Sequence, residues 1–117
     1  MAAPSPETLA AIEVRLRAIL APYETRLETA SIYGIPTLRK AGARAHDWFA
    51  FVKPEAKHVS FYLMPMVTDP ELMADVSPAL AKRRAGKSVL RFTAVDDGLF
   101  AEFDGLVARA YERYVAR

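Results

Sequence analysis

Residues 47–64 read D-W-F-A-F-V-K-P-E-A-K-H-V-S-F-Y-L-M, and this stretch decides the fold. Two runs rich in aromatic and β-branched residues flank a polar break at 53–57, a pattern typical of a β-hairpin. A turn centred on Glu55 predicts one face formed by the pairs Val52 with His58, Ala50 with Ser60, and Trp48 with Tyr62. Because strand side chains alternate in direction, the other face receives the pairs Phe51 with Val59 and Phe49 with Phe61.

The two predicted faces differ in chemistry. Phenylalanine and valine alone make up one face, which therefore belongs to a hydrophobic core. The other face mixes aromatic, hydroxyl and imidazole groups, and a semi-polar surface of this kind lines a small pocket or a protein contact. We therefore expect a binding face, whose first candidate residues are Trp48, His58, Ser60 and Tyr62.

A helix and a series of strands precede and include this hairpin. Ser5 and Pro6 carry the signature of a helix start, and the apolar spacing that follows predicts a helix ending near Pro22. From residue 28 to residue 67 the apolar pattern has a period of two, with turn signals at Gly42 and Pro54. This region predicts three or four consecutive antiparallel strands.

Short helices, one strand and a long helix follow. Thr68 or Asp69 is expected to cap one short helix, Ser77 to cap a second, and Gly86 to end it. Residues 88–93 predict a strand, and residues 96–114 carry the strongest helical periodicity in the chain. The pattern predicts an α+β fold, an antiparallel sheet with the N- and C-terminal helices packed on one face.

The composition is that of one ordinary globular domain. The chain has 117 residues, 52% of them hydrophobic and 26% charged, which predicts a single domain over 1–117. A net charge of +2 is too small to indicate nucleic acid, and no apolar run approaches the ~20 residues that span a bilayer. The chain has no cysteine, and its N-terminus lacks the pattern of a signal peptide. We therefore expect a cytoplasmic protein that binds neither nucleic acid nor membranes.

No residue pattern indicates catalysis or a metal site. Ser60 and His58 share a predicted face but lie about 6.5–7 Å apart along the strand, so hydrolysis by Ser60 is the least supported function. His46 and His58 fall near opposite ends of neighbouring strands, roughly 20 Å apart, which is too far for a shared metal ion. Basic residues beside the strands, among them Lys87 and Arg91, either hold a phosphate or carboxylate or discourage edge-to-edge pairing. The second role is favoured, and Lys87 and Arg91 are kept as candidate ligand-binding residues.

Four segments, taken in order, resemble the YdhG-like family, small bacterial domains of unknown function that include frataxin-like iron chaperones. These segments are Y-G-I-P-T (33–37), W-F-A-F (48–51), K-H-V-S-F-Y (57–62) and G-K-S-V-L-R-F (86–92). The resemblance implies a curved antiparallel sheet of about four or five strands. It also implies that the motifs at Tyr33 and at Lys57-His58 shape the semi-polar face, which adds Tyr33 to the candidates. Iron is implied as an alternative cargo, although the acidic residues are scattered or serve as helix caps and map to no metal ligand.

Two accounts of the semi-polar face stay open. Trp48, Ala50, Val52, Tyr62 and Met64 would leave an apolar patch larger than soluble monomers usually expose. Either a short helix from residues 70–85 covers it and makes a pocket for a small anionic or aromatic ligand, or a second copy covers it. We favour a homodimer, because the short helices are small and highly charged. The predicted function is a non-enzymatic binding or interaction module that needs no cofactor.

Overall fold

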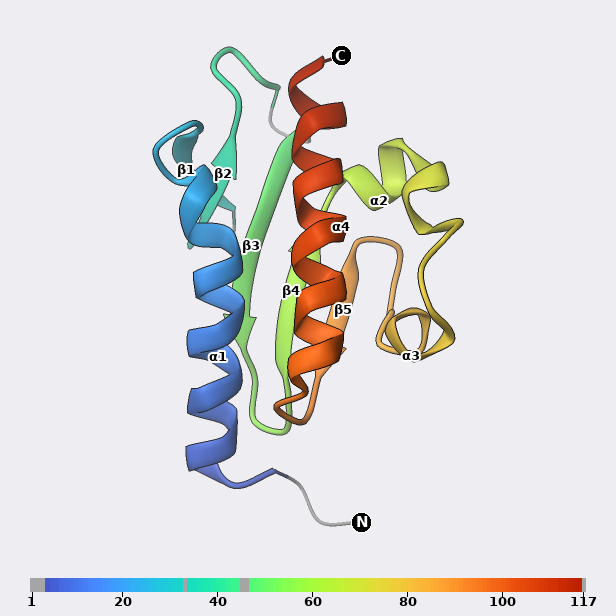
Figure 1. Cartoon of the computed structure of the whole chain (residues 1–117). Coiled ribbons are helices and arrows are strands. Elements are labelled where there is room, and N and C mark those ends of the chain that lie inside the picture. Colours follow the sequence, from blue (N-terminus) through green and yellow to red (C-terminus); the bar gives the residue numbers. More distant parts are fainter. Residues whose placement is uncertain (1–3, 33, 45–46, 117) are drawn as a thin grey trace.

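The computed structural model describes residues 4–32, 34–44 and 47–116, and Figure 1 shows their arrangement. The chain begins with the helix α1, Pro6–Leu20, which continues into the 3₁₀ turn η1, Ala21–Tyr23. Ser5 caps α1 as predicted, because its hydroxyl accepts a hydrogen bond from the Thr8 amide at 3.1 Å. The apolar stripe of the helix is buried at Ile12, Leu16, Ile19 and Leu20.

Five antiparallel strands form one sheet in the order β1-β2-β3-β4-β5. Their bounds are Glu28–Ile32 for β1, Ile35–Arg39 for β2, Trp48–Pro54 for β3, Val59–Leu63 for β4 and Val89–Phe92 for β5. Gly34 has a φ of 80°, and this left-handed conformation, which glycine adopts without strain, allows the tight turn between β1 and β2. The predicted α+β fold with an antiparallel sheet is confirmed.

Three short helical segments connect β4 to β5, and a long helix ends the chain. They are α2, Pro65–Thr68; η2, Pro70–Met73; α3, Pro78–Ala81; and α4, Asp97–Ala116. The predicted cap of α3 is confirmed, because the Ser77 hydroxyl accepts a hydrogen bond from the Leu80 amide. Asp96 caps α4 in the same way, through the Leu99 amide. Both caps satisfy backbone N–H groups that the first turn of a helix leaves unpaired.

The prediction that Thr68 or Asp69 caps a helix with its side chain is wrong, and Thr68 is instead the last residue of α2. Asp69 precedes η2, but its side chain makes no capping hydrogen bond there. Its carboxylate instead accepts a hydrogen bond from the Arg113 guanidinium at 2.7 Å, and thereby joins the connecting segment to α4. Helical structure starts earlier than predicted, at Pro65.

Gly86, predicted as the end of a helix, lies elsewhere. The helix α3 already ends at Ala81, and the following residues pair with the outer edge of β5. The Ala85 amide donates to the Val89 carbonyl, and the Arg91 amide donates to the Arg83 carbonyl. Gly86 follows this short ladder, which covers part of an edge that would otherwise be open to another strand.

The pairing register of β3 with β4 differs from the prediction by three positions. The observed pairs include Phe51 with Tyr62, Val52 with Phe61, and Lys53 with Ser60. Pairing continues to Pro54, and the Glu55 amide donates to the His58 carbonyl at 2.9 Å, so Ala56 and Lys57 form the centre of the turn instead of Glu55. A shift by an odd number of residues changes which side chains share a face, and the predicted pairs are therefore wrong.

The main core lies between the sheet and the helices α1 and α4. Val59 and Phe61 belong to it as predicted, and so does Phe49; each is 0% exposed. Ala50 and Val52 also face this core, although the sequence predicted them on the opposite face. Phe51, predicted in the core, pairs with Tyr62 on the other side of the sheet. The corrected register accounts for these exchanges because it pairs odd-numbered residues of β3 with even-numbered residues of β4.

A bulge in β3 explains why Trp48 nevertheless shares a face with Tyr62, as predicted. Leu38 pairs with Ala50 and Arg39 pairs with Trp48, so β3 contains one extra residue, Phe49, at this point. Phe49 and Ala50 both reach the main core. Trp48 turns to the opposite face, where its ring centroid lies 5.1 Å from that of Phe51.

Candidate functional site

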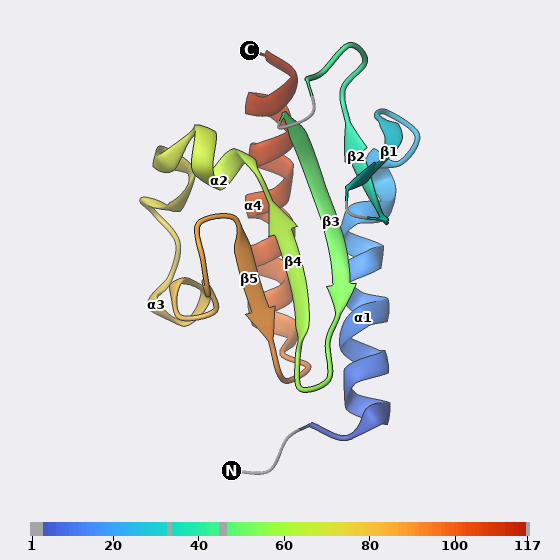
Figure 2. The same cartoon turned by 180° about the vertical axis from the view of Figure 1, so that it is seen from behind.

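The face of the sheet opposite α1 and α4 is here called the open face, and no helix of the described residues lies across it. In Figure 2 the strands β3, β4 and β5 lie in front of both long helices, and α2 and α3 lie beside β5. The segments α2, η2 and α3 pack against α4, and they contribute Met66, Leu72 and Leu80 to the main core. A helix from residues 70–85 therefore does not fold over the open face, and this alternative is wrong among the described residues.

Side chains on the open face form two rows that cross the strands. Phe51, Tyr62 and Val89 face one another in an apolar row, with one residue from each of β3, β4 and β5. Lys53, Ser60 and Arg91 form a polar row in the same way, two positions away along each strand. Residues two apart on a strand are about 6.6–7 Å apart, which is the separation between the rows.

Aromatic rings on the open face pack against one another and reduce each other's exposure to solvent. Phe51 and Tyr62 stack with centroids 4.5 Å apart and ring planes 12° apart, and Trp48 packs against Phe51. Trp48 is 7% and Phe51 6% exposed, whereas Tyr62 is half-buried. Mutual burial of the rings leaves a smaller apolar surface than the bare patch expected from the sequence.

The polar row combines a buried hydroxyl residue with two cations. Ser60 is 1% exposed and lies between Lys53 and Arg91, its direct neighbours on the adjacent strands. The Lys53 ammonium lies 3.0 Å from the Glu55 carboxylate, whose hydrogen bond and negative charge raise the pKa of Lys53. Arg91 is exposed and has no ion pair within the described part of the chain. Neighbouring positions on adjacent strands are about 5 Å apart, so both long cationic side chains can reach an anion above Ser60.

The structure brings four of the predicted site residues together on the open face: Trp48, Ser60, Tyr62 and Arg91. His58 is half-buried at the hairpin turn, directly before β4. Lys87 is exposed in the loop two residues before Val89. Tyr33 lies outside the described residues, as does His46. Phe51 and Val89 were missed, and Phe51 was assigned to the core because its place depends on the register of β3 with β4.

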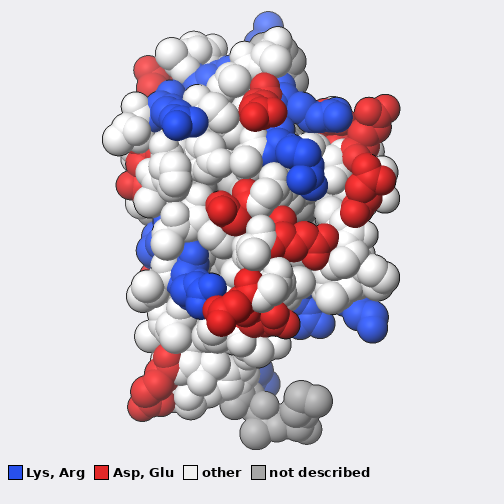
Figure 3. Space-filling model, viewed as in Figure 1, with Lys and Arg blue, Asp and Glu red and all other residues white. Residues whose placement is uncertain are grey.

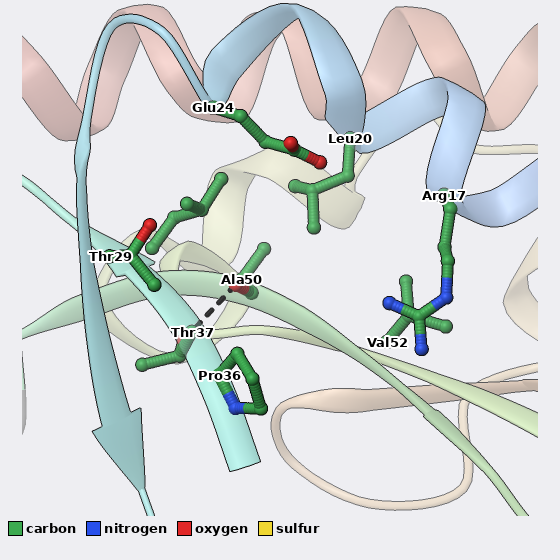
Figure 4. Close-up of a pocket in the computed structure, with 9 residues that line it drawn as sticks. Arg17, Leu20, Glu24, Thr29, Pro36, Thr37, Ala50 and Val52 are labelled. Atoms are coloured by element: carbon green, nitrogen blue, oxygen red, sulfur yellow. Dashed lines mark hydrogen bonds between the residues drawn. The ribbon is translucent and has the colours of Figure 1, made fainter.

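A cavity of about 170 Å³ on the helix side of the sheet was not predicted. Figure 4 shows it between the end of α1 and the strands β1, β2 and β3. Its lining residues are Arg17, Leu20, Glu24, Thr29, Pro36, Thr37, Leu38, Ala50 and Val52. Four of the apolar ones, Leu20, Leu38, Ala50 and Val52, are at most 7% exposed, so the cavity has an apolar floor.

The cavity adjoins an interruption of the β2–β3 ladder. Regular pairing of these strands includes only Leu38 with Ala50 and Arg39 with Trp48. Pro36, the next residue that would face Val52, has no N–H group to donate. The Thr37 hydroxyl donates to the Ala50 carbonyl at 3.1 Å and replaces a backbone bond there. A proline inside a predicted strand was the one signal in the sequence that could have indicated this interruption.

Charges on the helix side are mixed, and no metal centre is found among the described residues. Figure 3 shows acidic and basic side chains interspersed over this side of the molecule. No group of three or more histidine, aspartate or glutamate residues within 4–32, 34–44 and 47–116 could hold a metal ion. No helix of the described chain is long and apolar enough to cross a membrane.

The chain was compared with protein families, with curated proteins and with solved structures. No protein-family model, no curated protein and no solved structure matches it. The resemblance to the YdhG-like family, with the iron-chaperone function that it implies, therefore stays a prediction.

Proposed function

We propose that the protein is a non-catalytic binding module whose open face docks an acidic, aromatic-containing partner segment. The main support is that the polar row Lys53-Ser60-Arg91 lies directly beside the apolar row Phe51-Tyr62-Val89. A carboxylate above Ser60 gains two cationic neighbours, and an aromatic side chain one step away gains contact with the stacked rings. An extended peptide with an acidic residue and an aromatic residue two positions later has the matching spacing.

The charges of the open face favour a partner of opposite sign. Arg39, beside Trp48, lies 3.8 Å from Glu28, and Lys53 is paired with Glu55, so these two cations are partly compensated. Arg91 is not compensated by an ion pair among the described residues, and the exposed Lys87 adds a further positive charge in the loop before β5. Two copies that met by their open faces would bring these cations together, which disfavours that form of the predicted homodimer.

A peptide titration tests the proposal, with Trp48 as the reporter. It is the only tryptophan of the chain and lies on the open face, so its fluorescence reports binding there. We expect the peptide acetyl-Ala-Asp-Ala-Phe-Ala-amide to bind several-fold more tightly than its Asp-to-Asn analogue at low salt, an advantage that falls as salt rises. Light scattering of the free protein in the same buffer should give the mass of one chain, 13.0 kDa.

Two variants with the same charge change make the test specific. Arg91→Gln should abolish the preference for the acidic peptide, whereas Arg109→Gln, an exposed position on α4, should keep it. Equal behaviour of the two variants, or equal binding of both peptides, contradicts the proposal. A free mass of two chains together with a Trp48 signal that ignores the peptide would assign the open face to a second copy.

A further inference from the structure

The cavity beside α1 has an apolar floor and an uneven distribution of charge at its rim. Arg17 and Glu24 lie on either side of Leu20 in Figure 4, at the helix side of the cavity. The Arg17 guanidinium donates to the Glu13 carboxylate at 2.7 Å and is therefore compensated. The Glu24 carboxylate makes no ion pair and accepts no hydrogen bond within the described residues. The uncompensated charge at this rim is negative.

Two threonine hydroxyls also belong to the lining of the cavity. Thr29, on the edge strand β1, also lines the cavity, and its hydroxyl makes no hydrogen bond within the described residues. The hydroxyl of Thr37, in contrast, is committed to the Ala50 carbonyl. A ligand that enters the cavity meets the Glu24 carboxylate at the helix side of the rim, and a carboxylate is an acceptor suited to an ammonium group.

We propose that this cavity binds a small primary amine with a compact apolar body. The body would rest against Leu38, Ala50 and Val52, and the ammonium group would point to Glu24. An apolar cavity of about 150 Å³ accepts a molecule of the size of benzene, so a volume of about 170 Å³ accommodates such a body. A carboxylate ligand of the same size is disfavoured, because its charge would face Glu24 while Arg17 is engaged by Glu13. The site lies on the opposite side of the sheet from the open face and does not depend on the function proposed above.

Benzylamine, compared with the neutral benzyl alcohol and the anionic benzoate, tests the proposal. Binding is followed by the amide chemical shifts of Thr29, Thr37 and Ala50 in nuclear magnetic resonance titrations. We expect saturable shifts with benzylamine, weaker binding of benzyl alcohol by about two- to fivefold, as for an exposed ion pair, and the weakest binding for benzoate. Equal affinity for all three compounds, or no saturable shift, overturns the proposal.

Two variants separate the roles of the floor and the rim. Glu24→Gln should remove the advantage of benzylamine over benzyl alcohol, whereas Glu112→Gln, an exposed position on α4, should leave it unchanged. Ala50→Leu should fill the cavity and lower the affinity for both compounds at least tenfold. Because Ala50 is fully buried and this variant could misfold, the exposed Glu24 position carries the test by itself. If Glu24→Gln and Glu112→Gln behave alike, the amine assignment is wrong.

Discussion

Tyr114 holds both ends of the loop between β2 and β3 through one buried hydroxyl. Its side chain is 0% exposed; its oxygen accepts a hydrogen bond from the Lys40 amide at 2.9 Å and donates to the Asp47 carbonyl. The helical stripe in the sequence predicted that Tyr114 faces the core, but its hydrogen-bond partners could not be predicted. They lie 74 and 67 positions away and meet the hydroxyl only after α4 has docked on the sheet.

Replacement of Tyr114 by phenylalanine should destabilise the protein by about 0.5–1.5 kcal/mol, because the part-buried Lys40 amide and Asp47 carbonyl lose this hydrogen-bond partner. Urea unfolding followed by circular dichroism measures the change. Tyr111→Phe serves as the matched control, since the Tyr111 hydroxyl makes no hydrogen bond within the described residues. An equal loss in both variants would refute this role of the Tyr114 hydroxyl.

At the scale of elements, one carboxylate joins α3 to α4. Glu102 of α4 accepts hydrogen bonds from the Ser77 hydroxyl at 2.6 Å and from the Ser77 amide at 2.7 Å. Ser77 in turn caps α3. The hydrogen bond from the Ser77 hydroxyl, and after it the one from the Ser77 amide, lowers the pKa of Glu102 below its ordinary value. The ionised form of Glu102 is therefore favoured by folding.

The stability that this carboxylate contributes should depend on pH. Because its pKa is lower in the folded state, the contribution is present above the ordinary glutamate pKa and is lost as the pH falls through the folded value. Glu102→Gln should therefore unfold with a weaker pH dependence below pH ~4.3 than the unsubstituted protein. Thermal unfolding between pH 3 and pH 7 measures this difference. Glu112→Gln should retain the original pH dependence, and a Glu102→Gln profile identical to it would contradict the prediction.

The elements were more predictable than their register. Local signals at Ser5 and Ser77 predicted helix starts, because a cap depends on residues three positions apart. The hairpin turn was harder, since the polar break at 53–57 is compatible with more than one centre. Only the pairing of Pro54 with Val59 and the Glu55–His58 hydrogen bond fix it. The candidate site was therefore predicted in part: Trp48, Ser60, Tyr62 and Arg91 lie together, while Phe51 was assigned to the wrong face.

At the scale of the whole molecule, neighbouring strands of the sheet differ in how many residues they pair. The strands β3, β4 and β5 pair through continuous ladders, and the helices α1 and α4 pack on this part. The β1–β2 hairpin has its own complete ladder but meets β3 through two regular pairs. The cavity lies along this interrupted junction. Pro36 indicates the interruption in the sequence, but the cavity also depends on the packing of α1 over the junction, which no local stretch of sequence could have predicted.

Because β2 and β3 share only two regular pairs, we expect the β1–β2 hairpin to be locally less stable than the rest of the sheet. Segments with few bonds to their surroundings open at a lower free energy than the global unfolding reaction. We expect the amides of β1 and β2 to exchange with deuterium through such partial openings. The amides of β3 and β4 should exchange only when the whole protein unfolds. A small molecule held between α1 and the hairpin would contact both sides of the junction and slow this exchange. Uniform protection of all five strands would show instead that the sheet opens as one unit.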